Sequence, residues 1–141
     1  MIAIDTNLLV YAHRAATPEH RAAKRALERA SRDRAGWGIC LPCVTEFWAV
    51  VTHPEAAGRP STGAEATAFV KALVDAGAAV WGPGPGFADR LMQMADELAV
   101  TGPRVFDLQI ALAAFDNGAR ELWTHDRAFV SVPGLRVVDP L

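Results

Sequence analysis

The chain has 141 residues, of which 51% are hydrophobic and 21% charged, and its net charge is −2. This composition is that of a globular protein rather than a disordered one, and we expect one domain spanning residues 1–141. No apolar run reaches the roughly 18 residues that a membrane span needs, and no basic segment precedes an apolar one at the start, so we expect a cytoplasmic protein without signal peptide or membrane contact.

Strand-like apolar runs alternate with helical patterns along the chain. Continuous apolar runs predict buried strands, apolar positions three and four apart predict helices, and Pro, Gly and Asn mark the breaks. In chain order we expect a strand at 2–4, helices at 7–13 and 18–34, a strand at 37–41, helices at 44–52 and 64–76, a strand at 78–81, helices at 87–100 and 105–116, and strands at 121–124 and 135–138.

The helix expected at 18–34 carries a marked charge asymmetry. We expect Thr17 to cap this helix and Pro18 to occupy its first turn. Residues 14–34 hold seven Lys and Arg against three acids, a net charge of +4. Such a segment fits either a face that binds a polyanion or a solvated surface helix with ion pairs. The apolar residues that face the core at helical spacing are Ala22, Ala23, Ala26, Leu27 and Ala30.

This alternation predicts an α/β fold with a central parallel sheet covered by helices on both faces. Right-handed crossovers place every strand-to-helix joint at the same edge of such a sheet. Ligands in these folds bind at the carboxyl ends of the strands. We therefore expect the functional residues at those joints.

Four acids fall at that edge of the predicted sheet. Asp5 follows the first strand, and Asp126 follows the fourth. Glu46 lies in the first turns of the helix after the second strand, and Asp107 in the first turn of the last helix. Singly, each acid could cap a helix or complement its dipole. Two carboxylates about 4 Å apart repel by roughly 4 kcal/mol at an effective dielectric constant of 20, so a cluster of four predicts a bound cation.

The ligand type narrows the chemistry of this cluster. Oxygen-only ligands select a hard ion, Mg²⁺ or Mn²⁺, rather than zinc. Such an ion can activate a water and stabilise charge on a phosphoryl group, so the pattern indicates phosphodiester hydrolysis. Thr6, Asn7 and Thr124 are polar residues near these acids in the sequence. We expect their side chains to orient the acids or bound waters.

The two cysteines, Cys40 and Cys43, form the segment "CLPC". This spacing occurs in redox-active dithiols, which need a lowered thiol pKa. Cysteine is also a common buried residue. A zinc site built on this pair alone is excluded, because the sequence has no second Cys pair and no finger-like His spacing.

Five features follow one another along the chain: "IDTNLLVYA", a Glu in the helix after the second strand, "GPRVFDLQIALAAF", "LWTHDRAF" and the closing "VVDPL". In this order they resemble the PIN-domain ribonucleases, especially the toxins of VapBC toxin–antitoxin systems. The resemblance spans nearly the whole chain. It implies a three-layer α/β/α sandwich and an endoribonuclease that depends on Mg²⁺ or Mn²⁺. It also implies an RNA substrate, a homodimer and a small antitoxin protein as partner.

The same resemblance suggests roles for individual residues. It assigns the family's acidic quartet to Asp5, Glu46, Asp107 and Asp126. Asp5 and Asp107 would be the metal ligands, and Thr124 stands where the family often has a Ser or Thr near the metal. Ala128 replaces a second acid that many relatives carry two residues after the fourth one. The resemblance gives no reason for "CLPC".

Three other functions would require different features of the sequence. A phosphohydrolase of the haloacid dehalogenase type would need an acid two residues after Asp5, where this chain has Asn7. A thiol-disulfide oxidoreductase would use Cys40 and Cys43. A non-catalytic PIN-like binding module would keep the fold without the chemistry, but all four acids are present.

Aromatic residues in two helical segments suggest a partner surface. Residues 8–13 and 44–51 carry Tyr11, Phe47 and Trp48. These rings either line a groove for an antitoxin helix, with a basic residue of that partner reaching the acids, or belong to the core.

Overall fold

The computed structural model describes residues 1–56 and 58–141. Five strands form one fully parallel sheet in the order β3-β2-β1-β4-β5. The strands are β1 (Ile2–Ile4), β2 (Trp37–Cys40), β3 (Ala78–Trp81), β4 (Glu121–Trp123) and β5 (Arg136–Val138). The helices are α1 (Thr6–His13), α2 (His20–Ser31), α3 (Leu41–Thr52), α4 (Gly63–Asp75), α5 (Phe87–Glu97) and α6 (Arg104–Asp116).

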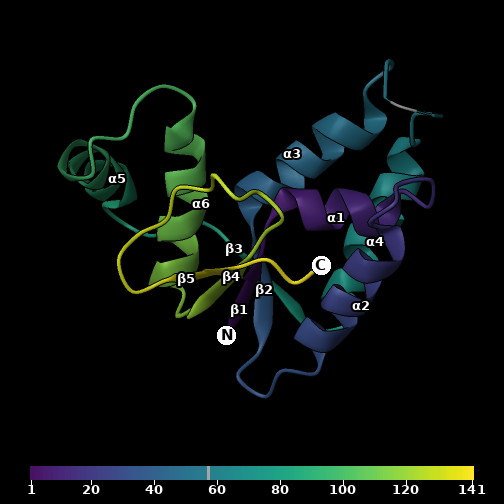
Figure 1. Ribbon diagram of the computed structural model, residues 1–141, viewed down its shortest axis with the longest axis horizontal. Helices are drawn as coiled ribbons and strands as arrows, with labels where there is room; N and C mark the ends of the chain where they lie inside the picture. The colour runs from purple at the N-terminus through teal and green to yellow at the C-terminus, as the bar shows by residue number, and fades with distance from the viewer. Residues whose placement is uncertain (57) are drawn as a thin grey trace.

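The helices form two layers around the sheet. Helices α5 and α6 lie on one side, and α1 to α4 lie on the other (Figure 1). The predicted α/β/α sandwich with a central parallel sheet is therefore confirmed. Within the described ranges, none of the helices combines the length and the hydropathy needed to cross a membrane.

The chain changes direction at the middle of the sheet. From β1 it moves outward through α1 and α2 to β2, and through α3 and α4 to β3. It then returns through α5 and α6 to β4, on the other side of β1. The gap between the carboxyl ends of β1 and β4 is thus a topological switch point, where ligands bind in folds of this kind.

The central strands are short and fully buried. Every residue of β1 and β2 is buried, as expected for parallel strands covered on both faces. Gly38 in β2 allows Trp81 to pack across the strand: a Cβ at Gly38 would lie 2.6 Å from the Trp81 ring and 2.8 Å from the Ala79 carbonyl oxygen. Close packing thus requires glycine at this position.

The predicted helix boundaries hold to within a few residues, with two corrections. Helix α2 begins at His20 rather than at Pro18, and Thr17 does not cap it. The Thr17 hydroxyl instead donates to the Arg14 carbonyl at 2.9 Å, so it belongs to the turn before the helix. Helix α3 begins at Leu41, directly after β2, with Pro42 in its first turn. Helix α2 begins late because a local turn holds Thr17. Helix α3 begins early because proline is tolerated in the first turn of a helix.

Candidate active site

Asp5 lies at the end of β1, where the chain enters α1. Its backbone N–H donates to the Trp123 carbonyl at 3.0 Å, so the residue is still tied to β4. The side chain is buried, and its Oδ1 atom accepts the Thr6 N–H at 2.8 Å, which caps α1. Its Oδ2 atom accepts from Asn7 Nδ2 at 2.9 Å and from Thr124 Oγ1 at 2.6 Å. One oxygen therefore caps the helix and the other faces the end of β4.

Thr124 and Asn7 join the β1 end to the loop after β4. Asn7 Nδ2 also donates to Thr124 Oγ1 at 2.8 Å, and Asn7 Oδ1 accepts the His125 N–H at 3.1 Å. Thr124 Oγ1 accepts the Asp126 N–H at 3.0 Å. The structure thus places two of the three predicted orienting residues directly between Asp5 and Asp126.

Glu46 reaches the same place from α3. Thr6, the first residue of α1, donates its hydroxyl to Glu46 Oε2 at 2.6 Å. Thr6 is itself buried, so its side chain cannot swing away from this bond without disturbing the packing. The third predicted orienting residue therefore positions Glu46 and, through its backbone N–H, also Asp5.

Asp107 and Asp126 are held together by a residue that the sequence analysis did not identify. Arg104, at the start of α6, places its Nη1 atom 3.0 Å from Asp107 Oδ2 and 3.3 Å from Asp126 Oδ2. Asp107 Oδ2 also accepts the Val130 N–H at 3.3 Å. The three-residue spacing of Arg104 and Asp107 on a helix signals an ion pair. The contact with Asp126 depends on the loop after β4 and has no local signal.

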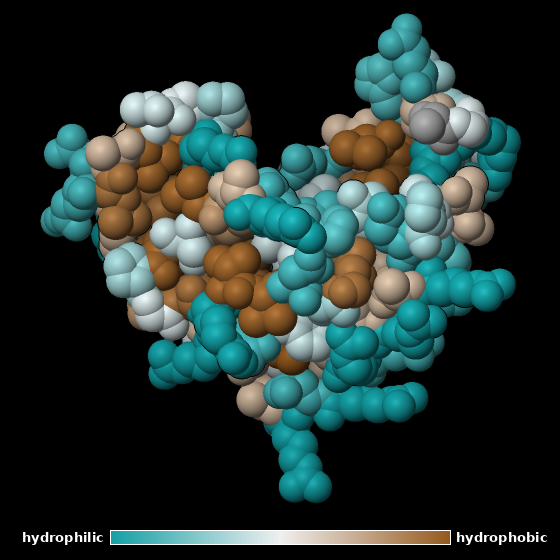
Figure 2. All heavy atoms as spheres, viewed as in Figure 1, coloured by the Kyte–Doolittle hydropathy of each residue, from teal (hydrophilic) through white to brown (hydrophobic). Residues whose placement is uncertain are grey.

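All four acids line a single pocket of about 320 Å³. It opens between α1, α3 and α6, where Figure 2 shows the surface hollowed. The other lining residues are Thr6, Asn7, Val10, Tyr11, Val50, Phe106 and Ile110. The structure therefore brings together the four acids that the sequence placed at one edge of the sheet.

The electrostatics of the pocket follow from burial and from this clustering. The pKa of Asp5 is raised from 3.8 to about 6, chiefly by burial. The negative charges of Glu46 and Asp107 raise it further, while the hydrogen bonds from Thr124 and Thr6 oppose the shift. The charges of two of the other acids therefore act on the Asp5 carboxylate.

The donor set of the pocket fits a hard divalent cation. The pocket offers carboxylate and hydroxyl oxygens, which are the ligands that Mg²⁺ and Mn²⁺ prefer. Its four acids outnumber the guanidinium of Arg104, so its charge is net negative. In the present arrangement, no three His, Cys, Asp or Glu side chains of the described residues are grouped closely enough to hold an ion. Ion binding therefore requires the carboxylates to turn toward a common centre.

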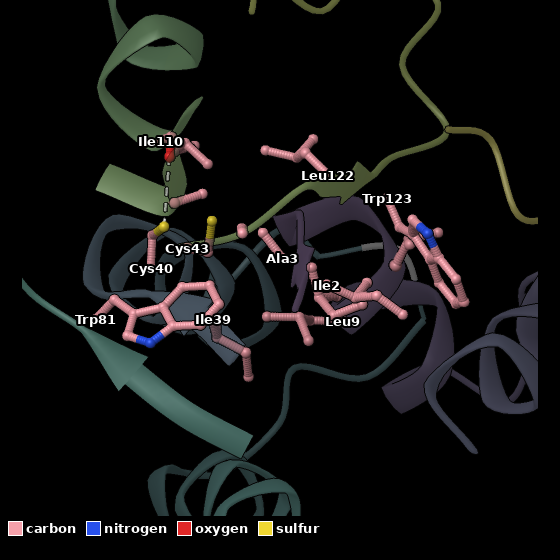
Figure 3. Packing of buried hydrophobic residues seen from close by; sticks show 14 of the residues in the cluster. Ile2, Ala3, Leu9, Ile39, Cys40, Cys43, Trp81, Ile110, Leu122 and Trp123 are labelled. Atoms are coloured by element: carbon pink, nitrogen blue, oxygen red, sulfur yellow. Dashed lines mark hydrogen bonds between the residues drawn. The ribbon is translucent and has the colours of Figure 1, made fainter. Parts of the chain in front are cut away.

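The two cysteines are placed where a reactive dithiol would not work. Both side chains are buried, and Cys40 Sγ donates to the Ile110 carbonyl at 3.4 Å (Figure 3). Burial, with the nearby Asp5 charge, raises the pKa of Cys40 to about 12 and that of Cys43 well above its usual range. Reactive thiols need the opposite shift. Both cysteines therefore act as core residues, and the oxidoreductase alternative has no support.

Comparison with known proteins shows the family of the chain. The family model for the PIN domain matches residues 2–135. VapC ribonuclease Mb2897 of Mycobacterium bovis is 33% identical to this chain, over all of this chain and 96% of that protein. This chain is a PIN-domain protein of the VapC ribonuclease family. Ribonuclease VapC48 of Mycobacterium tuberculosis is 28% identical to this VapC-family chain, over 96% of this chain and 94% of VapC48.

Solved structures share the fold of this VapC-family chain. A chain of VapBC2 from Rickettsia felis superimposes with a TM-score of 0.69 at 18% identity, over 98% of both chains. In that structure VapBC2 is bound to a DNA fragment from its promoter. Mycobacterium tuberculosis VapC20, a toxin that cleaves the sarcin-ricin loop, gives a TM-score of 0.65 at 16% identity, over 94% of this chain and 98% of the other. At these identities the likeness concerns the fold.

Proposed function

We propose that this chain is a toxin endoribonuclease that hydrolyses RNA phosphodiester bonds with Mg²⁺ or Mn²⁺ held by its four acids. The observation that carries the proposal is the meeting of Asp5, Glu46, Asp107 and Asp126 in one pocket at the switch point of the sheet. Membership of the VapC ribonuclease family supports RNA as the substrate class.

The acids divide into two pairs by how firmly they are held. Asp5 accepts three hydrogen bonds and is buried, so it is the most rigid ligand in the pocket. Asp107, whose side chain is only 20% exposed, is the second metal ligand that we propose. Glu46 and Asp126 complete the site, as further ligands or as acceptors for the attacking water. When bound, Mg²⁺ or Mn²⁺ supplies activation of that water and stabilisation of charge on the phosphoryl group.

The neutral side chains set the geometry of the acids before any ligand arrives. Thr124 and Asn7 fix Asp5 Oδ2, and Thr6 fixes Glu46. These donors are uncharged, so they leave the negative charges of Asp5 and Glu46 available to attract a cation. These hydrogen bonds limit how far Asp5 and Glu46 have to move when an ion binds.

A small antitoxin protein is the partner that we propose. The structural neighbours include the R. felis VapBC2 pair and FitAcB from Neisseria gonorrhoeae, with TM-scores of 0.69 and 0.64. Next to the acidic pocket, a hollow of about 640 Å³ lies between α3 and α6, and the exposed apolar side chains of Leu41 and Phe106 line it. An amphipathic segment could bury these side chains. A homodimer, as the family resemblance implies, is part of the same proposal.

The three aromatic residues of the expected partner surface lie in different places. Phe47 is fully buried and stacks on Phe69 of α4, so it is a core residue. Trp48 is 46% exposed and, together with Val70 and Val74, lines a second hollow between α3 and α4. We propose that the same antitoxin also covers this hollow. Tyr11 alone of the three lines the acidic pocket.

RNA cleavage by matched variants tests the proposed function. Asp5→Asn and Asp107→Asn should each abolish cleavage in Mg²⁺, and EDTA should abolish cleavage by the parent, because the site has no nucleophile of its own. Asp75→Asn is the control, since Asp75 is exposed on α4 and, among the residues that the structure describes, forms an ion pair with Lys71 alone. Undiminished cleavage by either active-site variant at matched purity would overturn the assignment.

A further inference from the structure

Arg104 places a positive charge inside the acidic pocket. Its Nη1 atom contacts the Oδ2 atoms of both Asp107 and Asp126, at 3.0 and 3.3 Å. Over the described ranges, Arg104 is the one Lys or Arg paired with any of the four acids. Asp5 and Glu46 are held by neutral hydroxyl, amide and backbone donors instead. Arg104 is therefore the counter-ion of half of the acidic cluster.

The guanidinium occupies an oxygen that a bound ion would need. Asp126 Oδ1 accepts the Ala128 N–H at 2.8 Å, which leaves Oδ2, the atom that Arg104 contacts, to face a ligand. Asp107 is likewise contacted through Oδ2. A divalent ion and a guanidinium on the same carboxylates would repel each other. Electrostatic repulsion therefore makes ion binding and the Arg104 contacts oppose one another.

A displaced Arg104 has a natural second partner. Its side chain is 46% exposed at the edge of the pocket, so it can turn outward without unpacking the core. The planar guanidinium binds phosphate oxygens in a bidentate manner more readily than a point charge does. The scissile RNA strand must bring phosphates to this edge of the pocket.

We propose that Arg104 is a built-in counter-ion that a divalent ion displaces and that then binds an RNA phosphate beside the site. This inference rests on the proposed function and adds a residue to it. Arg104 holds the acids together while the pocket has no ion, and it positions RNA when the ion is present. One side chain thus couples ion binding to substrate binding.

Mn²⁺ titration of the full chain, followed by electron paramagnetic resonance of the free ion, tests the first half. Arg104→Gln should bind Mn²⁺ more tightly than the parent, by roughly two- to tenfold, because a competing exposed ion pair has been removed. Arg90→Gln is the matched control. Arg90 forms a bidentate pair with Asp116 at the other end of α6, with distances of 2.6 and 2.7 Å. This control should bind Mn²⁺ as the parent does.

Fluorescence anisotropy of a labelled, mixed-sequence, single-stranded RNA oligonucleotide tests the second half, with Ca²⁺ in place of Mg²⁺ to slow cleavage. Arg104→Gln should bind this RNA roughly three- to tenfold more weakly than the parent. The loss should be smaller in EDTA, where Arg104 of the parent remains on the acids. Arg104→Lys keeps the charge without the planar fork, so it should lie between the two.

The outcomes separate the two proposals. Unchanged or weaker Mn²⁺ binding by Arg104→Gln would overturn the inference, since Arg104 would then only hold the acids in place. An equal loss of RNA affinity with Ca²⁺ and with EDTA would overturn the exchange of partners. If parent and Asp5→Asn bind no Mn²⁺ at all, the proposed function fails together with the inference. If the parent binds Mn²⁺ and Asp5→Asn does not, only the role of Arg104 is at stake.

Discussion

Thr124 donates a 2.6 Å hydrogen bond to Asp5, although 119 positions separate the two residues in the chain. The bond joins the carboxyl ends of β1 and β4, the two strands between which the chain changes direction. The fold therefore brings an acid and its positioning hydroxyl together at the point where parallel α/β sheets bind ligands.

Removing this hydroxyl should weaken the fold most when Asp5 is ionised. Thr124→Val keeps the shape of the side chain but removes the shortest of the three hydrogen bonds that the buried Asp5 carboxylate accepts. The free energy of unfolding at pH 8 should therefore fall by about 1–3 kcal/mol. The loss should shrink below pH 6, because Asp5 is protonated there. Urea denaturation of the ion-free protein at pH 8 and pH 5 measures both values.

The exposed Thr45 provides the control for this substitution. Its hydroxyl donates to carbonyls of its own helix, at 2.9 Å to Pro42 and 3.5 Å to Leu41. Thr45→Val should therefore change stability little and equally at both pH values. A similar, pH-independent loss in Thr124→Val would mean that the hydroxyl serves packing rather than the Asp5 charge.

The architecture and the four acids could be predicted from the sequence because both depend on local patterns. Short apolar runs such as 2–4 and 78–81 are strands, and an acid at the end of such a run marks a joint. Parallel topology then places all joints at one edge without further information.

Side-chain directions could not be predicted in the same way. Phe47 and Trp48 are neighbours in the nearly uniform apolar stretch "VTEFWAVV", and a helix turns them about 100° apart. Only the packing of α4 against α3 decides that Phe47 is buried and Trp48 exposed. The second contact of Arg104 depends similarly on how the loop around Asp126 folds back.

Trp48 should contribute to partner binding more than to stability. Because its ring is 46% exposed, Trp48→Ala should lower the melting temperature only slightly, but it should weaken the complex with the antitoxin, the small protein that we expect to be encoded just upstream. Phe47→Ala should instead cost roughly 3–5 kcal/mol of stability, since it opens a cavity in the core. Thermal melts and titration calorimetry with the purified partner compare the two variants. A lower melting temperature with unchanged affinity in Trp48→Ala would show that Trp48 serves the fold.

The raised pKa of Asp5 makes the ion-free protein sensitive to pH in a defined direction. The folded state holds the Asp5 proton up to about pH 6, whereas an unfolded chain releases it near 3.8. Between these values the folded state binds more protons, so stability is fully present below pH 3.8 and declines as pH rises to 6. Since one pKa unit corresponds to about 1.4 kcal/mol, the loss above pH 6 is on the order of 3 kcal/mol.

Asp5→Asn should remove this decline. The introduced amide still caps α1, because Asn caps about as well as Asp. Its nitrogen faces the Asn7 side-chain amide, which offsets part of the stability gained by removing the charge. At pH 8 without ions, the variant should therefore be more stable than the parent by about 1 kcal/mol or more, although inactive. At pH 4 this advantage should disappear, since Asp5 of the parent is then largely protonated. Thermal melts at the two pH values give the comparison.

Adding Mg²⁺ should reverse the order of the two proteins. An ion that binds only the folded state stabilises it by mass action, and binding at Asp5 requires the ionised carboxylate. At pH 8, excess Mg²⁺ should therefore raise the melting temperature of the parent and raise that of Asp5→Asn much less. Below pH 6, Mg²⁺ should no longer raise the melting temperature of the parent. If Asp5 acted only as a helix cap, both proteins would melt alike in EDTA and in Mg²⁺. Melts of parent and variant in EDTA and in Mg²⁺ at pH 8 and pH 5 therefore decide between a cap and a metal ligand that repels its neighbouring acids until an ion arrives.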